Sequence, residues 1–341
     1  MRKLIIIASI LLCTNSVFAV KIATLNEIMR PYCITVDNGQ LYIVDDNIIR
    51  LYSLEGPKHI TTIGRKGLGP GEFPFSPSIQ TFPGLLLVNS WGKIMFFARD
   101  GQYKNEKRLD FPISYFVYPL FPLGEEGFLG PRHKLGEMSI AFTIFDKDLN
   151  PLKELSSGLP NLPPMVPPGG APKRDIDLIG DCWNYFVYKD KIFLADTRIG
   201  FYFKVFNFKG EGLYEIQLTY KKINVEKEDK ERFMERLEAS RDWDKNKSYF
   251  NVIFRDTYPA FACFQIANDK IYAYTYTRKD DKYEIIVLDL NGNILKRVYV
   301  GPDLPNTNTF KNRFSISNNK IYYLKEDVEK ENWDLYADEI E

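Results

Sequence analysis

The feature that most constrains the fold of this chain is a repeated pattern of short strands and tight turns. Each repeat has a polar turn, a short apolar stretch, a charged or small turn and a second apolar stretch, as in "NGQLYIVDDNIIRLYSLEG" from Asn38. The apolar stretches are rich in β-branched and aromatic residues and are bounded by Gly, Asn, Asp or Pro, which is typical of β-strands. Six such segments occur, and they begin at Asn38, Pro83, Glu125, Lys189, Asn268 and Asn318.

Two further strands flank most of these segments. A short run precedes each one, such as "YCITV" from Tyr32 or "YFVYPL" from Tyr115, and another follows most of them, such as "HITTIG" from His59. Three of the five intervals between successive units are near ~40–50 residues, the usual length of a propeller blade. The sequence therefore predicts an all-β fold, a six-bladed β-propeller of four-stranded antiparallel blades. The second strands begin near Leu41, Leu85, Phe128, Ile192, Ile271 and Ile321.

The two ends of the chain predict how the ring closes. The sixth unit stops after its third strand, at "WDLYADEIE", and the segment "KIATLNEI" from Lys21 has no blade of its own. If this N-terminal strand completes the last blade, the ring closes and only short, protected strand edges remain. A β-sandwich is the alternative all-β fold, but it gives no reason for six similar units.

The first 19 residues, "MRKLIIIASILLCTNSVFA", have the pattern of a secretory signal peptide. Arg2 and Lys3 precede a short apolar run, and small residues precede a cleavage point after Ala19. The run is too short to span a bilayer. A retained anchor and a lipid-modified Cys13 are the alternatives, although Leu12 is bulky where lipidation favours a small residue. We expect an exported protein, periplasmic or extracellular, whose residues 20–341 form one propeller domain.

Composition narrows the partners and the covalent chemistry. The chain has 45 Lys and Arg against 45 Asp and Glu, so it lacks the basic excess that nucleic-acid binding requires. Three cysteines, Cys33, Cys182 and Cys263, follow the signal peptide, and an odd number permits at most one internal disulfide. The favoured interpretation is that they are small buried hydrophobic residues.

Two insertions interrupt the predicted ring. The Pro- and Gly-rich segment at about 156–175 cannot form a helix or a central strand, so we expect a long loop between blades three and four. The segment at about 224–245 predicts a helix, with Asn224 as a candidate cap and acidic residues in the first turn. An apolar stripe of Phe233, Met234 and Leu237 is expected to pack on the rim of the ring beside blades four and five.

The stretch "GRKGLGPGEF", Gly64 to Phe73, resembles a phosphate-binding loop only in its glycines. A phosphate loop is followed directly by a helix N-terminus, whereas Pro74 and Pro77 and then a strand follow here. We interpret the stretch as the crossing between two blades, where glycine permits conformations that a Cβ would forbid.

The crossings and the turns between second and third strands should share one face of the ring. Four arginines there, together with His133 and Trp91, are candidates for binding an anionic ligand through forked hydrogen bonds and stacking. The alternative is that these are solvated loop charges, paired with acids such as Asp45, Asp196 or Asp281. The candidate arginines are Arg65, Arg132, Arg198 and Arg278.

Parts of the sequence resemble a known family. "LYIVDDNIIRLYSLEG" and "IFLADTRIGFYFKVFNFKG" are similar to NHL-type propeller repeats, with an Asp after the second strand. "GRKGLGPGEF" and "FRDTYPAFACFQIANDKIYAYTYT" resemble six-bladed propeller proteins exported by many bacteria. The third unit, "FLGPRHKLGE", lacks the Asp. The resemblance covers nearly the whole mature chain and implies the propeller fold, but it does not specify a function.

Motifs for catalysis are scarce. Two histidines, His59 and His133, are too few for a three-histidine metal site, and no GxSxG, CxxC or HExxH motif occurs. We therefore expect a binding module without a cofactor, which holds a protein, a peptide, an anionic small molecule or a glycan over the central channel. The alternative is a calcium-assisted hydrolase or lyase, with Asp45, Asn89 and Asp196 as ligands. Each Asp has a second interpretation, in which it caps the turn that follows.

Overall fold

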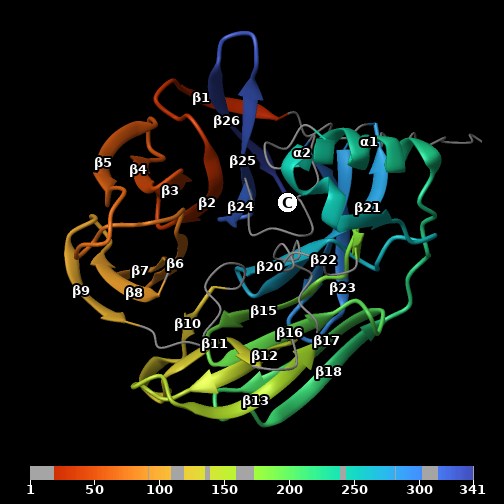
Figure 1. Cartoon of the computed structure of the whole chain (residues 1–341), viewed down its shortest axis with the longest axis horizontal. Helices are drawn as coiled ribbons and strands as arrows, with labels where there is room; N and C mark the ends of the chain where they lie inside the picture. Colours follow the sequence, from red (N-terminus) through yellow and green to blue (C-terminus); the bar gives the residue numbers. More distant parts are fainter. Residues whose placement is uncertain are drawn as a thin grey trace, which may run out of the picture.

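The strands form six four-stranded antiparallel sheets arranged around a centre, as Figure 1 shows. The computed structural model describes residues 19–90, 92–108, 119–134, 139–158, 173–238, 243–280, 282–301 and 314–340. In each sheet the strands follow one another in chain order from the inner strand outwards, apart from the outer strand of the last blade. The chain is therefore a six-bladed β-propeller, as the repeat predicted.

The first three blades come from the N-terminal half of the chain. Blade 1 contains β2 (Pro31–Asp37), β3 (Gln40–Asp45), β4 (Ile48–Ser53) and β5 (Lys58–Ile63). Blade 2 contains β6 (Ser78–Phe82), β7 (Leu85–Ser90), β8 (Lys93–Ala98) and β9 (Tyr103–Arg108). Blade 3 contains β10 (Phe121–Pro122), β11 (Phe128–Lys134), β12 (Ser139–Phe145) and β13 (Pro151–Gly158), with the short helix η1 (Gly124–Glu126) after β10.

The other three blades complete the ring. Blade 4 contains β15 (Trp183–Tyr188), β16 (Lys191–Asp196), β17 (Phe201–Asn207) and β18 (Gly212–Leu218). Blade 5 contains β20 (Cys263–Ala267), β21 (Lys270–Lys279), β22 (Lys282–Asp289) and β23 (Ile294–Val300). Blade 6 contains β24 (Phe314–Ser317), β25 (Lys320–Asp327), β26 (Asn332–Glu339) and the N-terminal strand β1 (Val20–Leu25).

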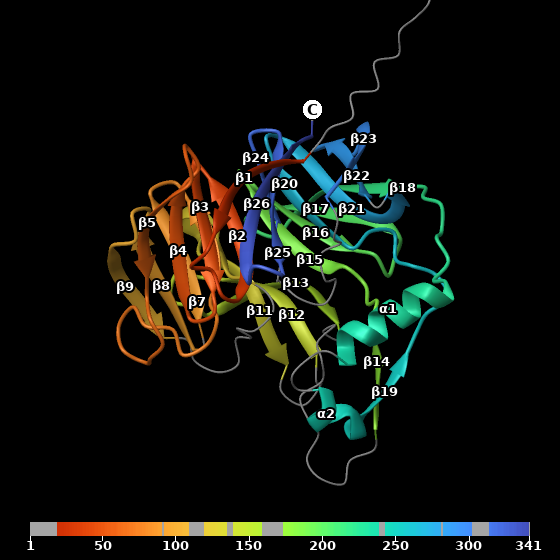
Figure 2. The same cartoon turned by 90° about the horizontal axis from the view of Figure 1, so that it is seen from above.

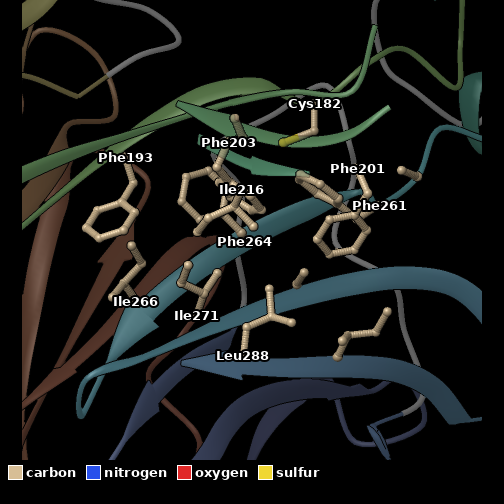
Figure 3. Close-up of a cluster of buried hydrophobic side chains, with 14 of the residues drawn as sticks. Cys182, Phe193, Phe201, Phe203, Ile216, Phe261, Phe264, Ile266, Ile271 and Leu288 are labelled. Atoms are coloured by element: carbon tan, nitrogen blue, oxygen red, sulfur yellow. The ribbon is translucent and has the colours of Figure 1, made fainter. Parts of the chain in front are cut away.

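Each blade buries both of its faces against its neighbours. In β7, Leu86 and Val88 belong to the cluster shared with blade 1, whereas Leu87 belongs to the cluster shared with blade 3. A strand that is covered on both sides is apolar at successive positions, which explains runs such as Leu41–Val44. Figure 3 shows the same arrangement between blades 4 and 5, where Phe203 and Phe264 meet.

The N-terminal strand closes the ring as predicted. β1 pairs with β26 in antiparallel register, so that Leu25 lies opposite Trp333. Lys21 forms an ion pair of 2.7 Å with Asp334. Leu25 and Ile28 are buried in the cluster between blades 6 and 1. The outer strand of blade 6 therefore comes from the opposite end of the sequence.

Blade 3 departs from the prediction at its inner strand. We expected that strand at "YFVYPL", of which Tyr115 to Tyr118 lie outside the described residues. The strand that the structure does describe is β10, only Phe121 and Pro122 long and later in the sequence than expected. Pro119 and Pro122 have no N–H to donate, which limits regular pairing on either side of Phe121.

A second unit stands on one face of the ring, and we call it the accessory unit. It contains β14 (Arg174–Asp177), α1 (Lys227–Glu238), α2 (Trp243–Asn246), the short helix η2 (Lys247–Tyr249) and β19 (Phe250–Ile253). β14 and β19 pair in parallel, and this joins the ends of the two insertions. Figure 2 shows the accessory unit projecting from the ring on the side away from the C-terminus.

The helix of the accessory unit begins later than its predicted cap. Asn224 forms a bridge with Thr257 instead of capping, and α1 starts at Lys227. The N–H of Glu226 donates to the carboxylate of Asp229 at 3.2 Å, so an acid of the first turn satisfies a free amide there. Phe233 packs on a cluster that includes Tyr258 and Tyr276, which lies beside blade 5 as expected.

An arginine and two acids attach the accessory unit to blade 4. The Nε of Arg255 donates to Asp177 at 2.7 Å, and its two terminal nitrogens donate to Asp181 at 2.9 and 3.0 Å. Asp181 also accepts from the hydroxyl of Thr197, in the turn between β16 and β17. Most of the predicted Pro-rich loop, residues 159–172, lies outside the described residues, as does the predicted signal peptide up to residue 18.

Two predictions about composition can be compared with the structure. Cys33, Cys182 and Cys263 are free thiols; Cys182 is buried and the other two are half-buried. Burial raises the pKa of the Cys33 thiol to about 12. None of the helices in the described part of the chain is long and apolar enough to cross a membrane.

Candidate functional site

The crossings between blades and the turns between second and third strands lie on the same face, because the strands of each blade alternate in direction. We call it the crossing face; the accessory unit stands on it (Figure 2). Asp45 and Asp196 are the last residues of β3 and β16, on this face. Arg65 lies in a crossing and Arg198 in a turn. Trp91 lies outside the described residues.

The crossing between blades 1 and 2 is organised by a glutamate. The carboxylate of Glu72 accepts from the Nε of Arg65 at 2.6 Å and from the N–H of Gly69 at 2.8 Å. The hydrogen bond from Gly69 has the larger effect and that from Arg65 the next largest, and both lower the pKa of Glu72. Gly64 has a φ of +73°, and a Cβ there would lie 2.2 Å from the ring of buried Phe73. The glycines therefore allow a tight crossing, and no helix follows to bind a phosphate.

A buried lysine supports the same crossing from blade 2. The Nζ of Lys93 donates to the carbonyl of Gly69 at 2.6 Å and lies 3.3 Å from a carboxylate oxygen of Glu106. The N–H of Gly71 donates to that same carboxylate at 3.4 Å, and the amide of Asn47 donates to the carbonyl of Phe73. The loop is therefore held in one conformation by blades 1 and 2.

Asp45 has its carboxylate oxygens engaged by the chain around it. One oxygen accepts from the N–H groups of Met29 and Arg30, at 3.1 and 2.6 Å, and the other accepts from the Nε of Arg50 at 2.9 Å. The side chain is only 3% exposed. Asp45 thus fixes the crossing from blade 6 to blade 1.

Asp196 and Arg198 form a second closed arrangement, in blade 4. Arg198 donates from Nε and from a terminal nitrogen to the two oxygens of Asp196, at 2.7 and 2.6 Å. The guanidinium lies 4.9 Å from the ring centre of Trp183, which stacks on Phe142 of blade 3. The indole N–H of Trp183 donates to Ser156 at 3.1 Å. This stack joins blades 3 and 4 and holds Arg198 in place.

The other predicted cationic residues lie in strands. Arg132 and His133 are half-buried residues of β11, which continues through "GPRHK", where a loop was expected. Burial lowers the pKa of His133, which favours the neutral ring. Arg278 is exposed near the end of β21, and its guanidinium lies 5.3 Å from the ring centre of Tyr283. The predicted arginines thus lie on four separate parts of the crossing face, where Arg65 and Arg198 are each paired with an acid.

Asn89 differs from the other two predicted calcium ligands. It is 4% exposed, and its Oδ1 has no hydrogen-bond partner, in contrast to the oxygens of Asp45 and Asp196. Ser78, the residue opposite Asn89 in the β6–β7 pair, also has a buried hydroxyl oxygen without a partner. In the described ranges, no three His, Cys, Asp or Glu side chains are placed to hold a metal ion.

Sequence reasoning missed an apolar arc on the crossing face. Met29, Leu68 and Val328 are 73%, 75% and 76% exposed, more than any other large apolar side chain among the described residues. Met29 lies in the crossing from blade 6 to blade 1, Leu68 in the crossing from blade 1 to blade 2, and Val328 in the turn between β25 and β26. Phe75, 52% exposed, extends the arc in the second crossing. The sequence does show apolar residues in these turns, but it does not show whether their side chains are exposed or buried.

Comparisons with known proteins find distant structural likenesses and no match in sequence. No family model matches the chain, and no curated protein matches it. A solved structure of a protein of unknown function from Bacteroides caccae is 9% identical, with a TM-score of 0.42, over 81% of this chain and 84% of that one. A luciferin-regenerating enzyme is 12% identical, with a TM-score of 0.43, over 95% of each chain. The AfRom2 CNH domain is 13% identical, with a TM-score of 0.40, over 94% of this chain and 98% of that one. Likenesses at this level identify no function.

Proposed function

We propose that this protein is an exported binding module whose crossing face docks a protein partner. The observation that carries the proposal is the apolar arc formed by Met29, Leu68, Phe75 and Val328. Exposed apolar side chains are costly to hydrate, and the three that are more than 70% exposed among the described residues, Met29, Leu68 and Val328, all lie on this face, which favours a surface that a partner covers.

Hydrogen bonds support the two crossings that present Met29 and Leu68, which favours specific binding. Glu72 and Lys93 hold the crossing that presents Leu68, and Asp45 holds the backbone at Met29. A partner that meets side chains already held in place loses less conformational entropy on binding. The carboxylates that would serve a hydrolase are engaged in these supports, which favours a binding role for the face over a catalytic one.

Site-specific photo-cross-linking in the producing cell tests this proposal. A photoreactive residue at position 68 or 328 is expected to capture the same partner, identified by mass spectrometry. The matched controls are positions 152 and 213, where Leu152 and Leu213 are 62% and 47% exposed at the starts of outer strands, on the opposite face. Capture at the control positions alone, or at no position, would contradict the proposal.

Leu68→Ser and Val328→Ser then measure what the arc contributes. Both side chains are exposed, so the melting temperature should stay unchanged while capture from position 29 falls at least tenfold. Partner capture that is unaffected by both substitutions would place the interface elsewhere.

We further propose that the protein is exported with cleavage after Ala19 and that its blades are NHL-type repeats. The structure has a strand beginning at Val20, and Asp45 and Asp196 take equivalent places at the ends of second strands. N-terminal sequencing of the protein recovered outside the cytoplasm should begin at Val20. A cytoplasmic protein that begins at Met1 would contradict the export proposal.

A further inference from the structure

Among the described residues, three polar groups at the crossing-face end of the junction between blades 2 and 3 lack hydrogen-bond partners. Asn89 Oδ1 and Ser78 Oγ are buried acceptors without a donor, and both residues belong to blade 2. Arg132, in blade 3, is half-buried and makes no hydrogen bond or ion pair within the described part of the chain. Unpartnered buried polar groups are few in native proteins, so each requires an explanation.

Side-chain alternation shows that Asn89 and Ser78 point towards blade 3. In β7, Leu87 belongs to the cluster with Phe128 and Phe145 of blade 3, so Asn89, two residues further, points the same way. Ser78 lies directly opposite Asn89 in the antiparallel β6–β7 pair and therefore shares its side.

The same reasoning places Arg132 on the facing side of blade 3. Phe128 of β11 faces blade 2, and the β11–β12 register runs without a bulge from Phe128 to Lys134. Arg132, four residues after Phe128, therefore points towards blade 2, near the crossing-face end of its strand. Asn89 is near the same end of β7, so both side chains point into the junction from opposite sides; Figure 1 shows the two blades as neighbours.

The acid that senses the charge of Arg132 is already engaged by a lysine. Glu154, on the same side of blade 3, accepts from the Nζ of Lys134 at 3.0 Å. Its pKa is lowered because the bonds from Lys134 and Ser157 and the charges of Lys134 and Arg132 outweigh the effect of burial, which raises it. The guanidinium of Arg132 is left with five N–H donors and no acceptor from its own blade.

The two sides of the junction require complementary chemistry. Arg132 offers donors in a fork that fits a carboxylate, whereas Asn89 Oδ1 is an acceptor that needs a donor; the Ser78 hydroxyl beside it can accept or donate. A ligand that satisfies both has a carboxylate and, next to it, a hydroxyl or an ammonium group.

We propose that the junction between blades 2 and 3 is a binding site for a small α-hydroxy or α-amino acid. Its carboxylate accepts from Arg132, and its hydroxyl or ammonium group donates to Asn89 and Ser78. This site is separate from the apolar arc, so the docking of a protein partner does not depend on it.

Isothermal titration calorimetry on the protein as its host produces it tests the site with four probes: glycolate, glycine, acetate and inorganic phosphate. Glycolate or glycine is expected to bind at least tenfold more tightly than acetate, which has the carboxylate but no donor. Tighter binding of glycolate than of glycine would indicate a natural ligand with a hydroxyl group, and the reverse order would indicate an ammonium group.

Variants assign the contacts. Arg132→Gln should lower the affinity for glycolate or glycine at least tenfold. Arg132→Lys keeps the charge and the packing of the stem, so its affinity should lie between those of the unsubstituted protein and Arg132→Gln. Asn89→Ala and Ser78→Ala should reduce the preference over acetate. The matched control is Arg30→Gln, an exposed arginine on the same face.

Each remaining outcome would overturn the proposal. It fails if neither glycolate nor glycine binds, or if binding survives Arg132→Gln. It also fails if acetate or phosphate binds as tightly as they do, because the donor next to the carboxylate would then play no part.

Discussion

At the scale of single residues, aspartates at equivalent positions of two blades make different contacts. Asp45 and Asp196 both end a second strand, yet Asp45 holds a crossing and Arg50, whereas Asp196 holds Arg198 beside Trp183. The sequence predicted that both lie on the crossing face but left open whether they bind calcium or support turns. That choice depends on neighbours distant in sequence, such as Met29 for Asp45, which a repeat pattern does not specify.

Asp338 is a buried carboxylate whose pKa burial raises. Among the described residues its Oδ1 has no hydrogen-bond partner, and its Oδ2 accepts from the N–H of Gly301 at 3.4 Å. The folded state therefore holds its proton to higher pH than the unfolded state, and stability falls as the pH rises from the usual carboxyl pKa of 3.8 through the raised value.

Asp338→Asn should therefore stabilise the protein at pH 7, by about 1 kcal/mol, because the cost of burying the charge outweighs its attraction to Lys282 and an acceptor for Gly301 remains. Urea unfolding between pH 4 and pH 8 should show the gain growing with pH. Asp148→Asn, at a side chain that is 87% exposed, is the control and should change little. A destabilised Asp338→Asn at pH 7 would contradict this account.

Gly64→Ala should destabilise the protein by about 3 kcal/mol. The substitution adds backbone strain at φ +73° and places a Cβ 2.2 Å from the ring of Phe73, which is fully buried. Gly84→Ala separates the two effects, because Gly84 has a φ of +75° but no atom within 4 Å of the added Cβ. Chemical denaturation should give the larger loss for Gly64→Ala; equal losses would mean that the contact with Phe73 is unimportant.

At the scale of elements, the strands of the ring were predictable and the accessory unit was only partly so. Strand patterns and turn residues are local, and even the pairing of β1 with β26 followed from a missing fourth strand. The parallel pairing of β14 with β19 joins segments that lie in different insertions, and the sequence of neither segment indicates which strand it pairs with. The short β10 was misplaced because prolines interrupt the regular alternation on which the prediction depended.

Deleting residues 21–28 should lower the stability of the whole ring. The deletion removes the buried side chains of Leu25 and Ile28 and the partners of Asp334. Burial alone would raise the pKa of Asp334, but its bonds from Lys21 and Thr24 outweigh that effect and lower it. This contribution is present above the usual carboxyl pKa of 3.8 and is lost as the pH falls through the lowered value.

Thermal melting at pH 7 measures the effect. Leu25→Ala alone should cost about 2–5 kcal/mol, because a fully packed leucine is truncated, whereas Asn26→Ala, at an exposed position beside it, should cost little. A truncated protein that melts at the temperature of the intact one would show that the ring does not need its N-terminal strand.

At the scale of the whole molecule, the face opposite the accessory unit has short hairpin turns, and the crossing face has the three features that distinguish this propeller. These are the apolar arc over blades 6, 1 and 2, the polar junction between blades 2 and 3, and the accessory unit beside blades 4 and 5. The repeat predicted which residues share this face. It did not predict which of them are exposed, because exposure is decided by the packing between blades.

Removing divalent ions should leave the melting temperature unchanged. The oxygens of Asp45 and Asp196 already accept from N–H groups and arginines, so calcium would have to displace those donors to bind. Melting curves with EDTA and with added calcium should therefore coincide. A calcium-dependent increase would contradict this, since a ligand at 100 times its Kd adds about 2.7 kcal/mol.

The contact between Thr24 and Asp334 spans 310 positions of the sequence. During synthesis, the backbone groups of β1 that pair with β26 must be satisfied by water until residues 332–339 have emerged from the ribosome. Any chaperone that protects the unfolded chain therefore has to shield β1 for longer than the inner strands of the first blades, and that protection can end once β26 is available for pairing.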